Sequence, residues 1–169
     1  MPGRSALVVP FTLPAALAAT RDASDRMAAR GVPAHVTILF PFVPAESLGR
    51  EERAALIDIA ADRSAFVVRF GAVEQRETMV WLVPSDQAPF LELTAAVERR
   101  WPEHQPYGGI HDVLIAHLTL VENDDRTVRQ EAVSLAREVG PFEAVAGELR
   151  VIAESSAGRW RTIWRLPFV

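Results

Sequence analysis

The sequence contains no cysteine, which excludes several kinds of chemistry at once. Without Cys the chain cannot form a disulfide, a thiolate nucleophile or a zinc site that uses Cys ligands. Long apolar runs are missing too, and none reaches the length that spans a bilayer. The first residues lack the extended apolar stretch and cleavage site of a secretory signal. We therefore expect a cytoplasmic protein with no membrane partner.

The chain also lacks an excess of positive charge, because it has 18 basic and 22 acidic residues and a net charge of -4. A protein that grips long duplex nucleic acid usually carries a basic stripe, so we expect no such partner. A small phosphate ligand remains compatible with this charge, since a few well-placed donors can hold it. With 169 residues, of which 49% are hydrophobic, the chain is expected to form a single domain and to act as a monomer.

Periodicity and chain breakers divide the sequence into two series of elements in the same order. Apolar alternation indicates strands, and amphipathic stretches closed by Gly or Pro indicate helices. After a first strand at 6–10, each series is predicted to run helix, strand, helix, strand, strand. The first series comprises 15–30, 35–40, 50–62, 66–73 and 78–83, and the second comprises 89–101, 113–121, 126–139, 142–153 and 160–166.

The spacing of matching residues indicates an internal duplication, with repeats at approximately 5–85 and 86–169. The matching pairs are His35 and His117, 82 residues apart, Phe66 and Phe142, 76 apart, Gly71 and Gly147, also 76 apart, and Trp81 and Trp164, 83 apart. The predicted fold class is α+β. We expect two lobes related by a pseudo-twofold axis, each an antiparallel sheet with helices, flanking a central cleft.

A His-x-Thr motif occurs once in each series, as His35-x-Thr37 and His117-x-Thr119. Side chains alternate along a strand, so the His and Thr of each motif point to the same face while the middle residue enters the core. Two such strands beside a pseudo-twofold axis would direct two imidazoles and two hydroxyls into one cleft. A single motif of this kind is more often a buried strand histidine, but a matched pair at equivalent positions favours a functional site.

These groups suit the hydrolysis of a strained phosphodiester. A neutral histidine can take a proton from the attacking water, and an imidazolium can give one to the departing sugar oxygen. The ordinary histidine pKa of about 6.5 allows both forms near neutrality, and each positioned group contributes about 10²- to 10⁴-fold. The Thr hydroxyls can hydrogen-bond phosphate oxygens where charge builds up. This chemistry requires no metal and no other cofactor.

The sequence around both motifs resembles the 2′-5′ RNA ligase-like branch of the two-histidine phosphoesterases. Residues 33–44, Pro-Ala-His-Val-Thr-Ile-Leu-Phe-Pro-Phe-Val-Pro, are similar to the family's first motif. Tyr107 and the two glycines after it, followed by residues 116–121, are similar to the second. The resemblance covers most of the chain, because the spacing and element order agree as well. It departs at Ala116, where related sequences often have Pro.

The resemblance implies roles for the motif residues and a range of activities. His35 and His117 would be the acid–base pair, and Thr37 and Thr119 would bind phosphate. We predict a metal-independent phosphoesterase that hydrolyses a 2′,3′-cyclic or 2′-5′-linked phosphodiester in a small nucleotide or at an RNA end. Two alternatives stay open, since the family also includes ligases and members with no assigned activity. They are a 2′-5′ RNA ligase and a nucleotide- or RNA-end-binding module without turnover.

Two further residues are candidate substrate contacts. Tyr107 precedes the second motif, and its ring could stack on a base or pack against a lobe. Arg161, in the last predicted hairpin, could contact phosphate, although a solvated position is also compatible with the sequence. A metal-binding set of His111, Asp112 and His117 matches no ligand signature, so we predict no metal site.

Overall fold

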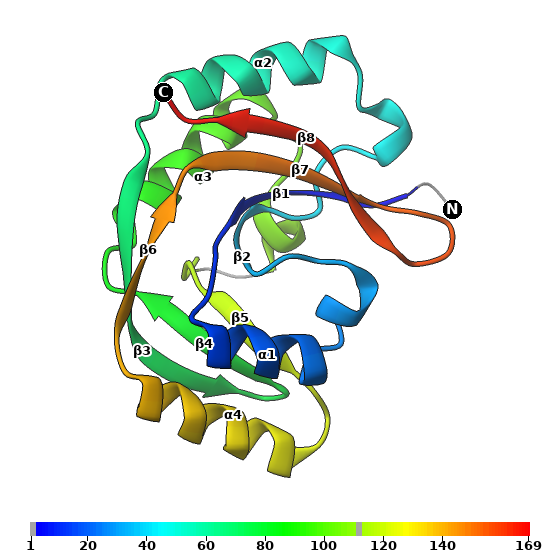
Figure 1. Cartoon of the computed structure of the whole chain (residues 1–169). Coiled ribbons are helices and arrows are strands. Elements are labelled where there is room, and N and C mark those ends of the chain that lie inside the picture. The colour runs from blue at the N-terminus through cyan, green and yellow to red at the C-terminus, as the bar shows by residue number, and fades with distance from the viewer. Residues whose placement is uncertain (1–2, 111–112) are drawn as a thin grey trace.

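The computed structural model describes residues 3–110 and 113–169, which form one curled antiparallel sheet flanked by helices (Figure 1). Its strands are β1 (Ser5–Pro10), β2 (His35–Leu39), β3 (Phe66–Arg76), β4 (Met79–Pro84), β5 (Leu118–Glu122), β6 (Phe142–Ala146), β7 (Glu148–Glu154) and β8 (Trp160–Pro167). Its helices are α1 (Ala15–Ser24), α2 (Arg50–Ala61), α3 (Ala88–Arg100) and α4 (Arg126–Val139), with short 3₁₀ helices η1 (Ala28–Arg30), η2 (Ala45–Ser47) and η3 (Pro106–Gly109). The predicted α+β class is confirmed.

The two motif strands are neighbours in the middle of the sheet. The strand order is β6-β3-β4-β5-β2-β1-β7-β8, and every neighbouring pair is antiparallel. Strands β2 and β5 meet at one bridging pair, in which Val36 lies opposite Leu118. One four-stranded half lies on each side of this seam. Because the sheet curls, the halves form two lobes that share the β2–β5 seam (Figure 1).

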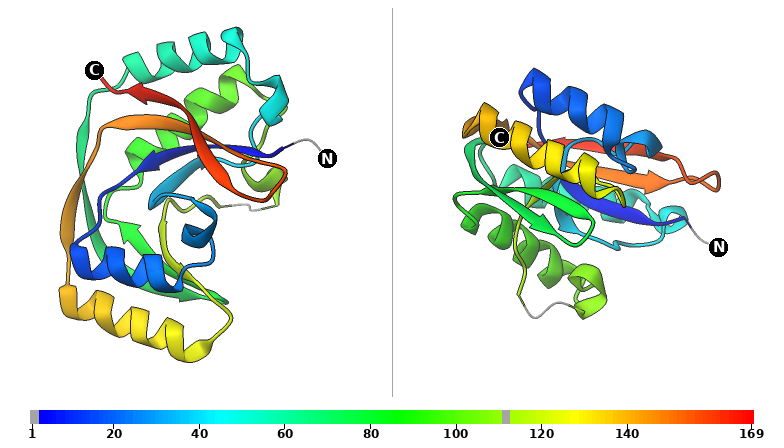
Figure 2. Two further views of the ribbon diagram at one scale, coloured as in Figure 1. Left: turned by 45° about the vertical axis from the view of Figure 1, so that its right-hand side comes forward. Right: turned by 90° about the horizontal axis from the view of Figure 1, so that it is seen from below.

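Each half of the sheet is packed against two helices from different parts of the chain (Figure 2). Helix α1 contacts β5 and lies beside α4, which also contacts β3 and β4. Helix α3 contacts β2 and lies beside α2, which contacts β8. Each lobe is therefore assembled from both halves of the sequence. None of the helices within the described ranges is both long and apolar enough to cross a membrane.

Alternation along the motif strands places their apolar side chains in the core. Val36, Leu118 and Leu120 have no exposed surface, and Ile38 keeps only 2%. Burying a side chain of this size stabilises the fold by about 1.5–3 kcal/mol. The motif residues His35, Thr37 and Thr119, on the opposite face of the same strands, stay half-buried, as the motif pattern predicts. The core thus fixes which face of the sheet presents the motif residues.

The helix predicted over 15–30 ends at Ser24. The reason is the buried carboxylate of Asp25, which accepts the backbone N–H of Ala28 at 2.7 Å and turns the chain into η1. The same carboxylate accepts the backbone N–H of Glu122 at 2.8 Å. The end of α1 is therefore set by a long-range contact with β5 that the local sequence does not reveal.

Two predicted strands also differ from the observed ones. The strand predicted over 113–121 begins only at Leu118, so His117 lies just before β5 rather than within it. Ala116, the residue before His117, hydrogen-bonds to the side chain of Gln87, the N-cap of α3. The strand predicted over 142–153 divides at Gly147 into β6 and β7, which lie in opposite halves of the sheet. The chain crosses between the lobes at this glycine.

Trp81 and Trp164, matched in the predicted repeat, occupy inequivalent places in the sheet. Trp81 on β4 lies opposite Thr119 of the second motif strand, whereas Trp164 lies on the edge strand β8. Counted outward from the seam, β4 corresponds to β1 and β3 corresponds to β7. The spacing of these two tryptophans therefore does not mark equivalent positions, and the repeat limits remain a prediction.

Candidate active site

The four motif side chains meet across the seam between β2 and β5. The bridging pair is formed by the middle residues of the two motifs, so in antiparallel register each His lies beside the Thr of the other motif. The two histidines then occupy diagonal positions, where Cα atoms are about 7–8 Å apart. We call the face of the sheet that carries His35, Thr37, His117 and Thr119 the motif face.

Backbone carbonyls orient both imidazoles in the same way. Nδ1 of His35 donates to the carbonyl oxygen of Pro33 at 2.7 Å, and Nδ1 of His117 donates to that of Ile115 at 2.8 Å. Because a carbonyl only accepts, Nδ1 carries the proton in each ring and Nε2 is left to exchange a proton with a ligand. Nε2 of His35 meanwhile accepts from the Thr37 hydroxyl at 3.1 Å. Both rings are thus set for proton transfer at Nε2.

The surroundings of His35 keep its imidazole neutral. Burial lowers the pKa of His35 from 6.5 to about 4, because desolvation disfavours the charged form. The hydrogen bond to Pro33 acts against this effect, while the charges of Arg21 and His117 add to it. The influence of His117 means that the two motif histidines are close enough to affect each other's protonation. At neutral pH, His35 is therefore a proton acceptor.

His117 stacks on the indole of Trp81, with ring centroids 3.6 Å apart and planes inclined by 12°. Trp81 reaches the motif face from β4, and the guanidinium of Arg76 lies 5.3 Å from its ring centroid. Arg76 in turn donates to Glu74 at 2.8 Å. Burial lowers the pKa of His117, while Arg76 lowers it and Glu74 raises it by opposing charge effects. The sequence indicated Trp81 only as a repeat position and did not reveal this stacking contact.

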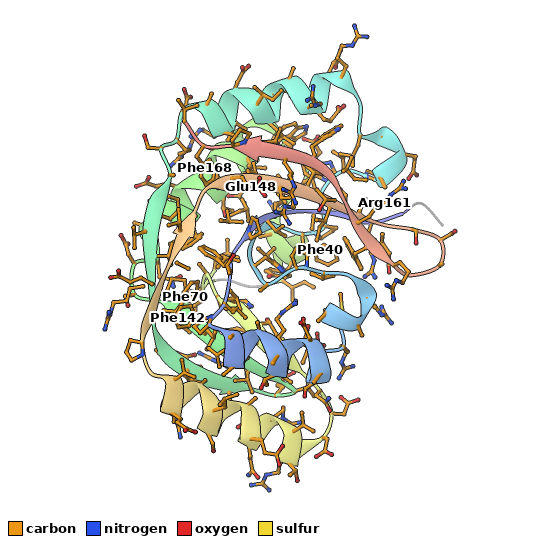
Figure 3. The ribbon with its side chains drawn as sticks, in the orientation of Figure 1. Phe40, Phe70, Phe142, Glu148, Arg161 and Phe168 are labelled. Carbon is orange, nitrogen blue, oxygen red and sulfur yellow. The ribbon has the colours of Figure 1, made fainter. Side chains whose placement is uncertain are left out.

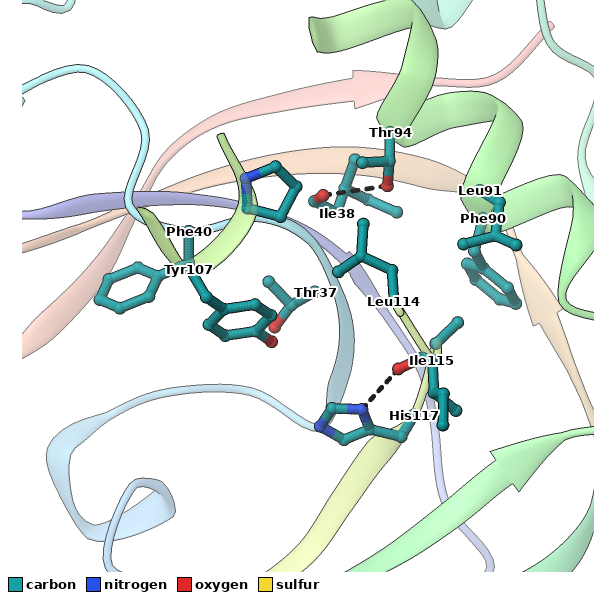
Figure 4. Close-up of a pocket in the computed structure, with 12 residues that line it drawn as sticks. Thr37, Ile38, Phe40, Phe90, Leu91, Thr94, Tyr107, Leu114, Ile115 and His117 are labelled. Atoms are coloured by element: carbon teal, nitrogen blue, oxygen red, sulfur yellow. Dashed lines mark hydrogen bonds between the residues drawn. The ribbon is translucent and has the colours of Figure 1, made fainter. Parts of the chain in front are cut away.

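Tyr107 joins the motif face from η3. Its hydroxyl is hydrogen-bonded to Thr37, and its backbone N–H donates to the Phe40 carbonyl at 2.6 Å. Its φ of 51° lies in the left-handed region, which a residue other than Gly adopts only where surrounding contacts hold it. Burial raises the pKa of Tyr107, so its hydroxyl stays protonated. Figure 4 shows the resulting pocket, in which Thr37, Tyr107 and His117 stand beside apolar side chains of α3 and residues 114–116.

Two polar side chains of α3 and its N-cap attach the motif segments to one rigid helix. Gln87 accepts the backbone N–H of Ala116 at 2.6 Å and donates to the carbonyl of the same residue at 3.0 Å. Thr94 donates to the carbonyl of Ile38 at 3.0 Å. These bonds hold the residue before the second motif and the residue after the first. The sequence analysis did not find them, because the partners are 29 and 56 residues apart and no local pattern marks them.

Arg161 does not join the motif residues. It is exposed near the β7–β8 hairpin and lies opposite Ala153 (Figure 3). Thr37 of β2 pairs with Val8 of β1, and Val8 pairs with Arg150 of β7. Arg150 therefore shares the motif face. Ala153 is three residues further along β7, which directs it and Arg161 to the opposite face. We therefore leave Arg161 out of the proposed site.

The remaining histidines contribute no metal site to the described part of the chain. His104 packs edge-on against Phe42, with ring centroids 6.0 Å apart. Within residues 3–110 and 113–169, no group of three His, Asp or Glu side chains is placed to hold a metal ion. His111 and Asp112, which the sequence analysis considered with His117, lie outside the described residues.

Comparison with known proteins identifies the family of this chain. The chain matches the family model of the 2′-5′ RNA ligase superfamily over residues 9–158, which includes both motifs. It therefore belongs to the 2′-5′ RNA ligase superfamily, a group of phosphoesterase- and RNA ligase-like enzymes. A comparison with curated protein sequences found no match.

Several solved structures share the fold at low sequence identity. E. coli LigT, crystallised with 3′-AMP, is 18% identical with a TM-score of 0.60, and the match covers 100% of this chain and 99% of that one. TT0787 of Thermus thermophilus is 19% identical with a TM-score of 0.61, covering 98% and 97% of the two chains. A structure described as a phosphoesterase is 16% identical with a TM-score of 0.60, covering 100% and 99%. These similarities establish the fold over the whole chain.

Proposed function

We propose that this protein is a metal-independent phosphoesterase that hydrolyses a 2′,3′-cyclic or 2′-5′-linked phosphodiester in a small nucleotide or at an RNA end. The observation that carries the proposal is the pairing of the two His-x-Thr motifs across one seam. Both imidazoles direct their Nδ1 proton to a backbone carbonyl, which leaves Nε2 as the proton-exchanging atom. At His35 a ligand takes the place of the Thr37 hydroxyl at Nε2. Two histidines at this spacing can act on opposite sides of a single phosphorus atom.

His35 acts as the base and His117 as the acid in the direction of hydrolysis. Nε2 of His35 takes a proton from water as the water oxygen bonds to phosphorus. The bond between phosphorus and one ribose oxygen breaks, and that oxygen takes a proton from Nε2 of His117. The pKa of about 4 supports His35 as the neutral partner. Burial lowers the pKa of His117, so the charged form that the acid requires is favoured by an anionic phosphate bound between the rings, with Glu74 acting in the same direction and Arg76 against it.

The hydroxyl groups of the site stabilise the charge that develops on phosphate. Thr37 and Thr119 each stand beside the histidine of the other motif, where they can donate to the non-bridging oxygens. Tyr107 holds Thr37 through its hydroxyl, and its ring forms part of the pocket wall on which a base can stack. Tyr107 is therefore retained as a substrate contact.

A small nucleotide is the ligand class that related structures favour. E. coli LigT has been crystallised with 3′-AMP, with NADP+ and with ATP. We extend this ligand class to the present chain because the folds agree over nearly the full length of both chains. The net charge of -4 also favours a short ligand over long duplex nucleic acid, which is bound mainly through phosphate neutralisation.

The test is a substrate panel assayed without added metal. It contains 2′,3′-cyclic nucleotides, short RNA with a cyclic-phosphate end and 2′-5′ dinucleotides. We expect turnover of at least one class, with His35→Ala and His117→Ala each slower by about 10²-fold or more and His104→Ala as the unaffected control. Saturable nucleotide binding without turnover would replace the enzyme by the binding module. Joining of RNA ends without hydrolysis would replace it by the ligase.

A further inference from the structure

A buried ion pair at the end of α1 lies outside the site described so far. Arg21 is 5% exposed and Asp25 is 2% exposed, and Nη2 of Arg21 lies 3.4 Å from Oδ2 of Asp25. Removing two charges from water costs several kcal/mol per ion, and an apolar pair of similar volume is often as stable or more stable. Stability alone therefore gives no reason for charges at these positions. Their contacts point to the motif face.

Arg21 shares a hydrogen-bond acceptor with His35. Nη2 of Arg21 donates to the carbonyl oxygen of Pro33 at 3.1 Å, and Nδ1 of His35 donates to the same oxygen at 2.7 Å. A carbonyl oxygen has two lone pairs, so both are occupied. The guanidinium thus fixes the position of the group that orients the imidazole. A displacement of this carbonyl would release the ring.

Asp25 connects the same unit to the second motif strand. Its Oδ1 accepts the backbone N–H of Glu122, the last residue of β5, at 2.8 Å. Its Oδ2 accepts the backbone N–H of Ala28 at 2.7 Å and faces Arg21. A continuous chain of polar contacts therefore runs from the end of β5 through Asp25 and Arg21 to Pro33, just before β2.

We propose that Arg21 and Asp25 form a positioning pair that holds His35 in its Nδ1-protonated form and in register with the second motif strand. The catalytic meaning of this pair rests on the proposed function, whereas its effect on the imidazole exists in the free protein. The positive charge of Arg21 opposes a second proton on the ring, which keeps Nε2 available as a base. The pair thereby fixes both the direction and the protonation state of His35.

The two motif histidines differ in this respect. Besides Arg21 and its partner Asp25, the titratable groups that face His35 are His117 across the seam and Tyr107 through Thr37. Arg150, paired with Glu148, shares the motif face from β7. At the second motif, the carbonyl that receives Nδ1 of His117 accepts from no other side chain among the described residues. Within residues 3–110 and 113–169, a charged positioning pair thus supports only the first motif, whose histidine is assigned as the base.

Nitrogen-15 NMR of the histidine rings tests the proposal without any substrate. Protein labelled at histidine is titrated from about pH 8 to about pH 4, a range that spans the ordinary and the shifted histidine pKa. The variants are Arg21→Gln, which removes the charge, and Arg21→Lys, which restores it. Arg26→Gln is the matched control, because Arg26 also joins the end of α1 to the β5 region through Asp124, at 2.7 Å, but lies on the surface.

In the unmodified protein we expect His35 to carry its proton on Nδ1 and to titrate near the acid end of the range. Arg21→Gln should move its titration to higher pH by about one pH unit, the effect of removing a nearby like charge, and should mix the two neutral tautomers. Arg21→Lys should recover most of the original midpoint, and Arg26→Gln should leave the spectrum unchanged.

Two results would overturn the proposal. One is a His35 ring protonated on Nε2 in the unmodified protein, a result that does not depend on whether any variant folds. The other is a midpoint and tautomer in Arg21→Gln equal to those of Arg26→Gln. These spectra are recorded without substrate. A substrate panel without turnover would therefore refute the proposed function but would not affect the interpretation of the NMR titration. Where a substrate is found, the acid limb of the kcat/KM profile should move with the NMR midpoint.

Discussion

Replacing His35 by asparagine should remove a defined part of the pH dependence of folding stability. The pKa of His35 is about 4 in the folded protein, against about 6.5 in an unfolded chain. Because the folded-state pKa is depressed, the associated stability is fully present above about pH 6.5 and is lost as the pH falls toward 4. The difference corresponds to about 3 kcal/mol at full extent, at 1.36 kcal/mol per unit of pKa.

The asparagine substitution isolates this effect because its amide can still donate to the Pro33 carbonyl but does not titrate. Urea unfolding, followed by tryptophan fluorescence, should be measured at several pH values from about 7 to about 4. The free energy of unfolding of the unmodified protein should fall by about 3 kcal/mol more than that of His35→Asn over this interval. His117→Asn should remove a dependence of the same sign, since burial also lowers the pKa of His117.

The reasoning would be refuted by a constant difference between the unmodified protein and His35→Asn across that interval. Such a result would mean that His35 accepts a proton as readily in the folded protein as in the unfolded chain. The neutral imidazole assumed for the base would then have no structural basis. A change of the opposite sign would contradict the burial argument in the same way.

Three further predictions concern catalysis on the best substrate of the panel. The double variant His35→Ala/His117→Ala should be little slower than the worse single variant in steady-state assays, because acid and base serve one transition state; additive losses would show independent roles. Turnover should survive EDTA, and a loss restored by a divalent ion would point to a metal mechanism instead. Tyr107→Phe should lower kcat/KM by about 5-fold, the usual worth of one hydrogen bond, while Tyr107→Ala should also raise KM if the ring supports the base; equal kinetics for both variants would remove the stacking role.

The residues of the candidate site and the direction of their side chains could be predicted from the sequence because they depend on residue type and short spacing. A His-x-Thr repeat in an apolar strand fixes the relative direction of its two side chains, since strand alternation is a local property of the backbone. The duplicated order of helices and strands likewise follows from periodicity and chain breakers, and it predicted the α+β class. His35 and Thr37 on β2 lie on the face that this reasoning expected.

Contacts between residues distant in sequence were decided only by the tertiary structure. The sequence predicted His117 inside a strand. In the structure, Gln87 holds Ala116 against α3, and β5 starts at Leu118, the residue after His117. It offered Arg161 as a phosphate contact, but the register of β7 and β8 directs that side chain away from the motif face.

The exchange of strands between the lobes, the Trp81 stack and the contact of Asp25 with Glu122 of β5 have the same origin. Each depends on which segments become neighbours in the fold, and the partners are set by burial of the whole core rather than by local propensity. A local pattern fixes where a side chain points along its own strand. Only the folded core fixes what lies opposite it, because that neighbour comes from a part of the chain tens of residues away.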